Sequence, residues 1–243
     1  MTPPLDKLSL QTGDGAAAVP QGIPDYLART YTWAYLNART LPWLDRSGVV
    51  SAILWGNARR LMRHAVAEFA PGQRVLQAAC VYGDFSPMLA RRVSALGALD
   101  VVDVAPLQVN NARKKLAGLS QTRVRQADLA GPDLGVATGT LDGAACFFLL
   151  HEVPEDARCR IVGNLLRVVR VGGKVVFTDY HRTHRWHPLA PVMALIFRWL
   201  EPFAPSLQNQ EIADLSPLAA DFEWHKTTSF GGLYQQVVAI RRR

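Results

Sequence analysis

Short apolar runs alternate with helix-patterned segments from residue 74 onward, which predicts a parallel sheet with helical crossovers. The clearest helix has Ala157, Ile161 and Leu165 on one face. Gly172 and Gly173 follow it and predict its end. The expected strands are 74–79, 98–104, 122–126, 142–148 and 173–179, and the expected helices between them are 86–96, 106–117 and 154–170. The pattern therefore predicts an α/β fold.

The segments on either side of this core differ from it in composition. Residues 1–22 are rich in Pro, Gly, Ala and Thr and predict a flexible lead-in, and helices are expected over 24–40 and 48–69. Strand patterns at 222–230 and 233–241, joined by Gly231-Gly232, predict a hairpin. We expect one domain over 23–243, made of N-terminal helices (23–71), a cofactor-binding core (72–180), an apolar insertion (181–221) and a C-terminal hairpin (222–243).

Composition narrows the class of protein. Of the 243 residues, 49% are hydrophobic and 19% are charged, which predicts a globular chain rather than a disordered one. Three scattered cysteines indicate neither a disulfide framework nor a zinc site, so we expect a reducing, cytoplasmic setting. No apolar run reaches about 18 residues, and the N-terminus has no signal-peptide pattern.

The net charge of +7 is compatible with an anionic binding partner, which could be nucleic acid, a membrane surface or a cofactor. We expect no nucleic acid, because no basic stripe with interleaved aromatic residues occurs. The apolar, aromatic stretch 188–203 predicts either core packing or an amphipathic segment on a membrane surface, and we favour the second. The sequence gives no indication of the oligomeric state.

Candidate site residues lie where the expected strands end, because ligands of open parallel sheets bind at the carboxyl ends of the strands. Asp103 follows the second strand and could accept hydrogen bonds from ribose hydroxyls, and Asp128 follows the third and could meet an adenine amino group. Each could equally be the N-cap of a helix. The turn after the first strand, 77–84, lacks the G-x-G-x-x-G pattern of dinucleotide folds.

The order of these elements resembles the class I S-adenosylmethionine-dependent methyltransferase fold over residues 70–180. It implies a mostly parallel, seven-stranded, Rossmann-like sheet with helices on both faces, an antiparallel C-terminal hairpin and an N-terminal helical extension. A closer resemblance rests on the segments ILWGNARRL (53–61), VLQAACVYGDFS (75–86), DVAPLQVNNARKKL (103–116), CFFLLHEVPED (146–156), GGKVVFTDYHR (172–182), HPLAPVM (187–193), LEPFAPSL (200–207) and FGGLYQQVVA (230–239). These segments resemble the rhodoquinone biosynthesis proteins of the RquA type, and the similarity spans nearly all of residues 22–241.

This second resemblance implies that ubiquinone becomes rhodoquinone when an amino group replaces one ring methoxy group. It further implies S-adenosylmethionine as the nitrogen donor, a divalent metal such as Mn²⁺, and a protein that lies peripherally on the inner face of the cytoplasmic membrane. Gln77 stands where an ordinary first motif has an acidic residue, and Ala79 and Val81 stand where it has glycines. Glycine lets a cofactor approach the backbone closely, so we expect an altered cofactor position.

Site residues carry over from the resemblance and from the chemistry of amination. The expected cofactor-binding residues are Gln77, Ala79, Cys80, Gly83, Asp103 and Asp128. The expected catalytic residues are Tyr82, His151, Glu152, Asp179 and His181. Asp179 and His181 are the expected metal ligands, with His151 or Glu152 next, because Mn²⁺ accepts carboxylate and imidazole together.

Alternatives remain open for both the residues and the function. His181, His184 and His187 could instead be solvated loop residues. The chain could also be a conventional methyltransferase acting on a quinone or phenol, or a non-catalytic protein that binds a cofactor or lipid.

Overall fold

The computed structural model describes residues 23, 24, 26, 27 and 39–243. The expected lead-in 1–22 and most of the expected helix 24–40 lie outside the described residues.

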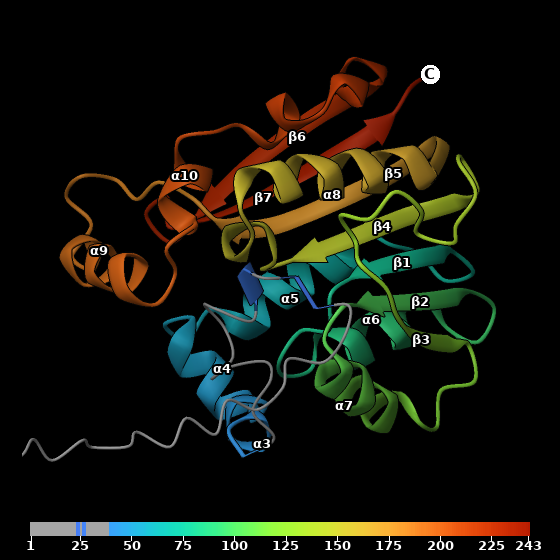
Figure 1. Ribbon diagram of the computed structural model, residues 1–243, viewed down its shortest axis with the longest axis horizontal. Helices are drawn as coiled ribbons and strands as arrows, with labels where there is room; N and C mark the ends of the chain where they lie inside the picture. Colours follow the sequence, from blue (N-terminus) through green and yellow to red (C-terminus); the bar gives the residue numbers. More distant parts are fainter. Residues whose placement is uncertain (1–22, 25, 28–38) are drawn as a thin grey trace, which may run out of the picture.

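Seven strands form one sheet in the order β3-β2-β1-β4-β5-β7-β6 (Figure 1). They are β1 Arg74–Ala78, β2 Ala98–Asp103, β3 Thr122–Gln126, β4 Leu141–Phe147, β5 Val169–Tyr180, β6 Phe222–Ser229 and β7 Tyr234–Arg241. Strands β1 to β5 are parallel, and β7 pairs antiparallel with both β5 and β6. The predicted α/β class, with a mostly parallel sheet and an antiparallel C-terminal hairpin, is confirmed.

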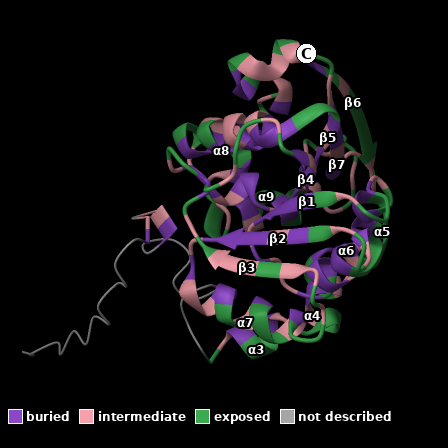
Figure 2. Cartoon of the chain, turned by 90° about the vertical axis from the view of Figure 1, so that its right-hand side faces the viewer, coloured by how far each residue is buried: buried purple, intermediate pink, exposed green. Residues whose placement is uncertain are grey.

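Helices cover both faces of the sheet, because both faces of its central strands are apolar (Figure 2). One face packs against α4 Ser47–Ile53, α5 Ala58–Ala67, α6 Phe85–Val93, α7 Pro106–Leu116 and α9 Ala190–Trp199. The other packs against α8 Glu155–Val168, α10 Ala204–Gln208 and the 3₁₀ turn η2 Ile212–Leu215. The remaining elements are the helix α3 Leu41–Leu44 and the 3₁₀ turns η1 Leu150–Glu152 and η3 Pro217–Asp221.

Two predicted boundaries are wrong. The helix expected over 48–69 is two helices, since the backbone of Trp55 and Gly56 is left-handed, with φ of 51° and 77°. The Asn57 amide donates to the carbonyl oxygens of Leu54 and Trp55 at this break, which satisfies the end of α4.

The second wrong boundary concerns Gly172 and Gly173, which lie inside β5 rather than at the end of a helix. Helix α8 already ends at Val168, and Val169 is extended. The pairing of β4 with β5 shifts register between Leu141 and Gly143. A Cβ on Gly173 would lie 2.7 Å from the Asp142 carbonyl oxygen, so this irregular pairing needs glycine there.

The carboxyl ends of β1, β2, β4 and β5 meet at one edge of the sheet, and α4 and α9 lie beside that edge (Figure 1). In the described part of the chain, no helix has the length and apolar character needed to cross a membrane.

Candidate functional site

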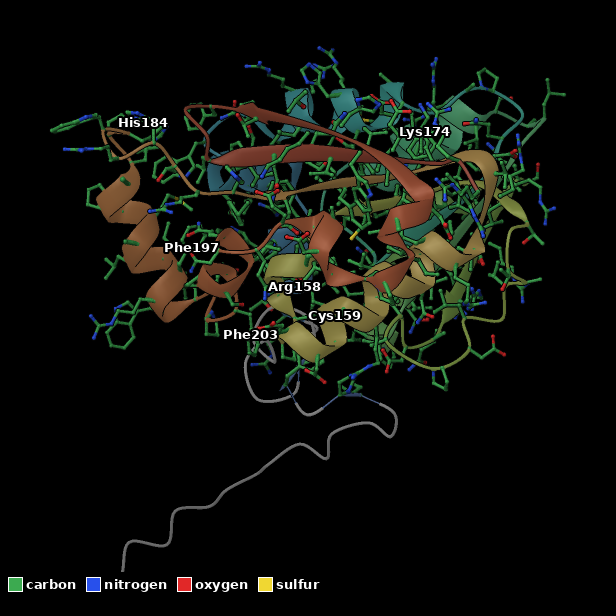
Figure 3. The ribbon with its side chains drawn as sticks, turned by 90° about the horizontal axis from the view of Figure 1, so that it is seen from above. Arg158, Cys159, Lys174, His184, Phe197 and Phe203 are labelled. Atoms are coloured by element: carbon green, nitrogen blue, oxygen red, sulfur yellow. The ribbon has the colours of Figure 1, made fainter. Side chains whose placement is uncertain are left out.

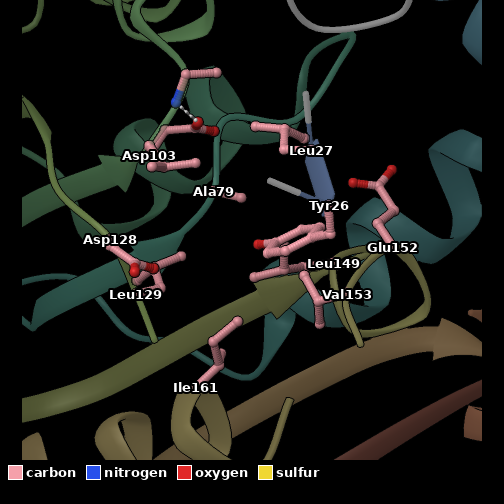
Figure 4. A pocket seen from close by; sticks show the side chains of 12 residues that line it. Tyr26, Leu27, Ala79, Asp103, Asp128, Leu129, Leu149, Glu152, Val153 and Ile161 are labelled. Carbon is pink, nitrogen blue, oxygen red and sulfur yellow. Dashed lines mark hydrogen bonds between the residues drawn. The ribbon is translucent and has the colours of Figure 1, made fainter. Parts of the chain in front are cut away.

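Two neighbouring pockets open at this edge of the sheet. The first, called here the Asp103 pocket, is lined by Tyr26, Leu27, Ala79, Asp103, Val104, Ala105, Asp128, Leu129, Leu149, Glu152, Val153 and Ile161 (Figure 4). The second, called the Trp55 pocket, is a cavity of about 470 Å³ lined by Leu44, Val50, Ala52, Ile53, Leu54, Trp55, Cys80, Val81, Tyr82, Phe147, Phe148, His151, Glu152, Tyr180, Met193, Ile196, Leu200 and Glu201. Glu152 lines both, so the two pockets lie next to each other at this residue.

Asp103 is held rigidly at the end of β2. Its Oδ2 accepts from the Cys80 backbone N–H at 2.6 Å, and its Oδ1 accepts from the Ala105 N–H at 2.7 Å. Burial raises the pKa of this carboxyl group to about 6, although these hydrogen bonds favour the charged form. An ionised carboxylate has about four lone-pair sites, so Asp103 can still accept from hydroxyl groups in the pocket.

Asp128 lies on the neighbouring strand end, and its Oδ1 accepts from the Ala130 N–H at 2.9 Å (Figure 4). The Tyr26 ring faces these two acids from the N-terminal segment, and Leu129, Leu149 and Ile161 supply apolar walls. The pocket therefore offers carboxylates at one end and an apolar slot beside them.

The turn after β1 folds inward around Gln77. This side chain is fully buried, and its Nε2 donates to the Ala79 carbonyl oxygen and to Ser86 Oγ, both at 2.8 Å. Ala79 has a φ of 67°, a left-handed conformation that favours glycine. Gly83 has a φ of 77°, and its N–H donates to Asp45 at 2.8 Å.

The expected cofactor-binding residues therefore separate in space. Ala79, Asp103 and Asp128 line the Asp103 pocket, while Cys80 lines the Trp55 pocket. Neither Gln77 nor Gly83 lines either of these pockets. The buried Gln77 side chain instead stabilises the turn through its hydrogen bond to Ser86. Tyr82, expected to be catalytic, lines the Trp55 pocket, and burial raises the pKa of its phenol.

One wall of the Trp55 pocket carries a buried histidine among carboxylates. His151 Nδ1 lies 2.7 Å from Asp179 Oδ1, and its Nε2 lies 3.8 Å from both Glu152 Oε1 and Glu201 Oε2. Burial lowers the pKa of His151, but Asp179 and the two glutamates outweigh this and raise it to about 9. At neutral pH the ring is therefore an imidazolium that can donate a hydrogen bond from Nε2.

Asp179 is the anchor of this arrangement. Its Oδ2 accepts from the Leu150 N–H at 2.8 Å, and its Oδ1 accepts from the Tyr180 N–H at 2.7 Å as well as from His151. These bonds fix the imidazole against the pocket wall. The remaining walls are aromatic, and Trp55 Nε1 donates to Met193 Sδ at 3.3 Å, joining α4 to α9 across the pocket.

Comparisons with known proteins agree with this geometry. A methyltransferase domain family model matches residues 75–173. A phosphatidylethanolamine N-methyltransferase of Cereibacter sphaeroides is 28% identical over 65% of this chain and 80% of its own length. A SAM-dependent methyltransferase structure from Aquifex aeolicus, 18% identical, has a TM-score of 0.56 over 84% of this chain and 97% of its own. Residues 75–173 thus match a methyltransferase domain, and the fold of the chain is that of the class I S-adenosylmethionine-dependent methyltransferases.

Two further relatives limit what the superfamily says about the reaction. An uncharacterized methyltransferase of Synechocystis is 24% identical over 86% of this chain and 94% of its own length. The [4+2]-cyclase SpnF, 17% identical, has a TM-score of 0.55 over 76% of this chain and 81% of its own. Because a cyclase has this fold, the fold alone does not fix the reaction.

The side chains of the Asp103 pocket have the chemistry that the adenosine end of S-adenosylmethionine, the cofactor of methyltransferases with this fold, would need. The carboxylates of Asp103 and Asp128 suit ribose hydroxyls and an adenine amino group, and the apolar slot suits an adenine ring. Methyltransferase chemistry would draw on the methyl group of this cofactor.

We expect Asp103→Asn to weaken S-adenosylmethionine binding by about 10- to 100-fold, because a charge-assisted hydrogen bond is lost. Binding to the unchanged protein should also weaken below about pH 6, where Asp103 becomes protonated, and this pH dependence should vanish in the variant. Calorimetry at several pH values measures both effects. Asp100→Asn, on the same strand but paired with Arg125, is the matched control and should bind normally. Equal affinities in the two variants would exclude Asp103 from the site.

The described residues do not fit the manganese site that the second resemblance implies. His181 lies apart from the pair His151 and Asp179, in a separate groove with His184, and its Nδ1 is 3.1 Å from the Gly232 carbonyl oxygen. Two backbone N–H groups and His151 take three of the roughly four lone-pair sites of the Asp179 carboxylate. Within residues 39–243 and the four described residues before them, no group of three or more His, Cys, Asp or Glu side chains could hold a metal. The structure therefore does not bring His181 together with Asp179 and His151, and a metal shared by these three residues stays an unconfirmed prediction.

Sequence reasoning missed Glu201 as a site residue. Glu201 follows α9, lines the Trp55 pocket and is the second carboxylate, besides Glu152, that lies 3.8 Å from His151 Nε2. The available signal was its position as the first acidic residue after Asp179, at the end of an apolar stretch.

Proposed function

We propose that the chain transfers a group from S-adenosylmethionine to the ring of a phenol or quinone that carries an apolar tail. The observation that supports this is the Trp55 pocket, which shares Glu152 with the Asp103 pocket. Its aromatic walls suit a planar ring, and its lining residues Ile53, Ile196 and Leu200, which are exposed or partly exposed, suit an apolar tail.

Methyl transfer is the reaction that the relatives favour, and we propose a phenol oxygen as its acceptor. The oxygen must lose its proton to become a good nucleophile, and the carboxylates of Glu152 and Glu201 lie where they could accept it. The His151 imidazolium would stabilise the resulting phenolate by donating from Nε2.

Amination of a quinone is the second candidate, and the turn after β1 favours it. Ala79 keeps a side chain at a left-handed position where glycine would be unstrained, and its methyl group borders the Asp103 pocket. The Ala79 methyl group would keep the amino acid portion of S-adenosylmethionine farther from the turn than glycine would, which supports a changed position of the cofactor. His151 would then donate to a quinone carbonyl oxygen, which makes the conjugated ring carbon electrophilic. The amine would add there and lose a proton to Glu152 or Glu201, and methoxide would leave as methanol after taking up a proton. For the nitrogen to stay on the ring as an amino group, its bond to the cofactor α carbon would then break with loss of a proton from the neighbouring β carbon.

Restoring the ordinary turn (Gln77→Asp with Ala79→Gly and Val81→Gly) separates the two reactions. If the chain aminates, the variant should lose at least about tenfold in rate even if it binds the cofactor more tightly, because tighter ground-state binding in the wrong position does not lower the barrier. If the chain methylates, the rate should be kept or should rise. Ala79→Gly alone serves as the milder control, since it removes only the strained side chain.

Mass spectrometry of quinones from a rhodoquinone-free host that expresses this chain tests the proposal. An added methyl group supports methyl transfer, and an amine in place of methoxy supports amination. An unchanged quinone and phenol pool, with the protein folded and binding S-adenosylmethionine, would contradict both.

A further inference from the structure

Helix α9 is apolar all round, but only one of its faces is packed. Met193 and Phe197 are buried against the core, whereas Val192, Leu195 and Trp199 follow at intervals of three and four on the outer face and are exposed. A helix that is hydrophobic on every side normally has its outer face covered as well. Among the described residues, nothing covers this face.

The exposed apolar surface extends beyond the helix. The α9 face consists of Ile53, Trp186, Val192, Leu195, Trp199 and Leu200. Trp186 is 74% exposed and Trp199 is 70% exposed. Both are large amphipathic side chains, which partition to membrane–water interfaces.

The segment 182–200, which carries most of the α9 face, has charges of one sign, and the acidic Glu152 and Glu201 line the neighbouring Trp55 pocket. Residues 182–200 contain three arginines and no acidic residue. Arg185 stacks on Trp186 with its guanidinium 4.6 Å from the ring centre, and Arg198 stacks on Trp199 at 5.6 Å. A guanidinium held beside an exposed indole can bind a lipid phosphate while the ring enters the apolar layer.

The α9 face also borders the mouth of the Trp55 pocket. Ile53 and Leu200 belong to both, since each lines the pocket and each is about half exposed. Figure 3 shows His184 and Phe197 at the α9 end of the molecule, with Lys174 of β5 near the opposite end. A tail leaving the pocket beside Ile53 and Leu200 would therefore emerge next to the exposed apolar side chains of the α9 face.

We propose that the α9 face docks on an anionic phospholipid bilayer, so that a tailed acceptor passes from the lipid directly into the Trp55 pocket. The route of the acceptor rests on the proposed function, whereas the docking itself does not. Charge complementarity favours lipid over a second copy of the chain, because two copies of this face would bring their arginines together.

Vesicle co-sedimentation of the full chain tests the docking. The protein should bind vesicles that contain phosphatidylglycerol more tightly than phosphatidylcholine vesicles, and added salt should weaken the difference. Trp186→Ser with Trp199→Ser should reduce binding by at least about tenfold, given the apolar area withdrawn from the lipid. Neither residue lines the Trp55 pocket.

The matched control is Leu96→Ser with Val171→Ser. These side chains are 85% and 57% exposed, and they lie at the amino ends of β2 and β5, opposite α9. The control should bind vesicles as the unchanged protein does. Equal loss in both double variants, or no vesicle binding by the unchanged protein, would overturn the proposal, as would a dimer in solution that the tryptophan substitutions dissociate.

Transfer assays on the same samples distinguish failure of the docking from failure of the proposed function. The tryptophan variant should lose activity on a tailed acceptor in vesicles but keep it on a water-soluble phenol or quinone without a tail. Equal activity of variant and unchanged protein on the vesicle-bound acceptor would contradict the docking route. If no acceptor reacts at all, the proposed function fails, while the vesicle-binding result still decides the docking.

Discussion

Replacing His151 with Gln should lower the rate of group transfer by about 100- to 10,000-fold, the range usual for loss of a positioned acid or base. Asp179 holds the His151 imidazolium against the wall of the Trp55 pocket, with His151 Nδ1 2.7 Å from Asp179 Oδ1. Glutamine is similar in size but carries no charge to stabilise a phenolate or polarise a quinone. Steady-state kinetics should show the loss mainly in kcat, with S-adenosylmethionine still bound.

His184→Gln is the matched control, because His184 lies in the separate groove and does not line the Trp55 pocket. Its rate should stay close to that of the unchanged protein. A folded His151→Gln variant with full activity would contradict the role of His151 and show that another side chain supplies the acid.

Replacing Arg158 with Met should destabilise the protein by about 3–5 kcal/mol, because several buried acceptors would lose their donor together. Arg158 has no exposed surface. It donates to the carbonyl oxygens of Leu150, Val153 and Phe203, to Gln210 Oε1 and to Ser206 Oγ. The side chain thereby ties α8 to η1, which carries His151 and Glu152, and to α10 (Figure 3).

The free energy of unfolding in urea measures this effect. Arg160→Met is the control two positions along the same helix, where the side chain is about half exposed and pairs with Asp156. It should cost about 0.5 kcal/mol or less. Equal costs for the two variants would show that the buried network contributes little.

The periodicity of the sequence predicted the sheet well where the strands are buried. The expected strand 98–104 differs from β2 by one residue at its end, since its apolar run stops at the polar Asp103. The expected strand 122–126 matches β3, although β3 has no buried residue. The hairpin of β6 and β7 was predicted from Gly231-Gly232, both with positive φ. Asp103 was placed correctly at the end of β2 for the same reason.

Tertiary contacts explain what the sequence did not predict. The break at Trp55 is invisible in an apolar pattern that continues on both sides of it. Asp179 looked available for a metal, yet backbone N–H groups of the two strand-end segments take up its oxygens. Arg158 belongs to the polar residues of its helix by pattern, and only the packing of α10 and η1 around it makes it buried.

The most direct test of a transfer from S-adenosylmethionine to a ring in the Trp55 pocket uses the purified protein. S-adenosylmethionine would carry one heavy isotope in its methyl group and another in its amino group, and the acceptors would be ubiquinone and its phenolic precursors. Mass spectrometry should find one of the two labels on the ring of the acceptor, the methyl label for methylation or the nitrogen label for amination, and should find neither with His151→Gln. Acceptors that stay unlabelled while S-adenosylmethionine is bound would contradict the account.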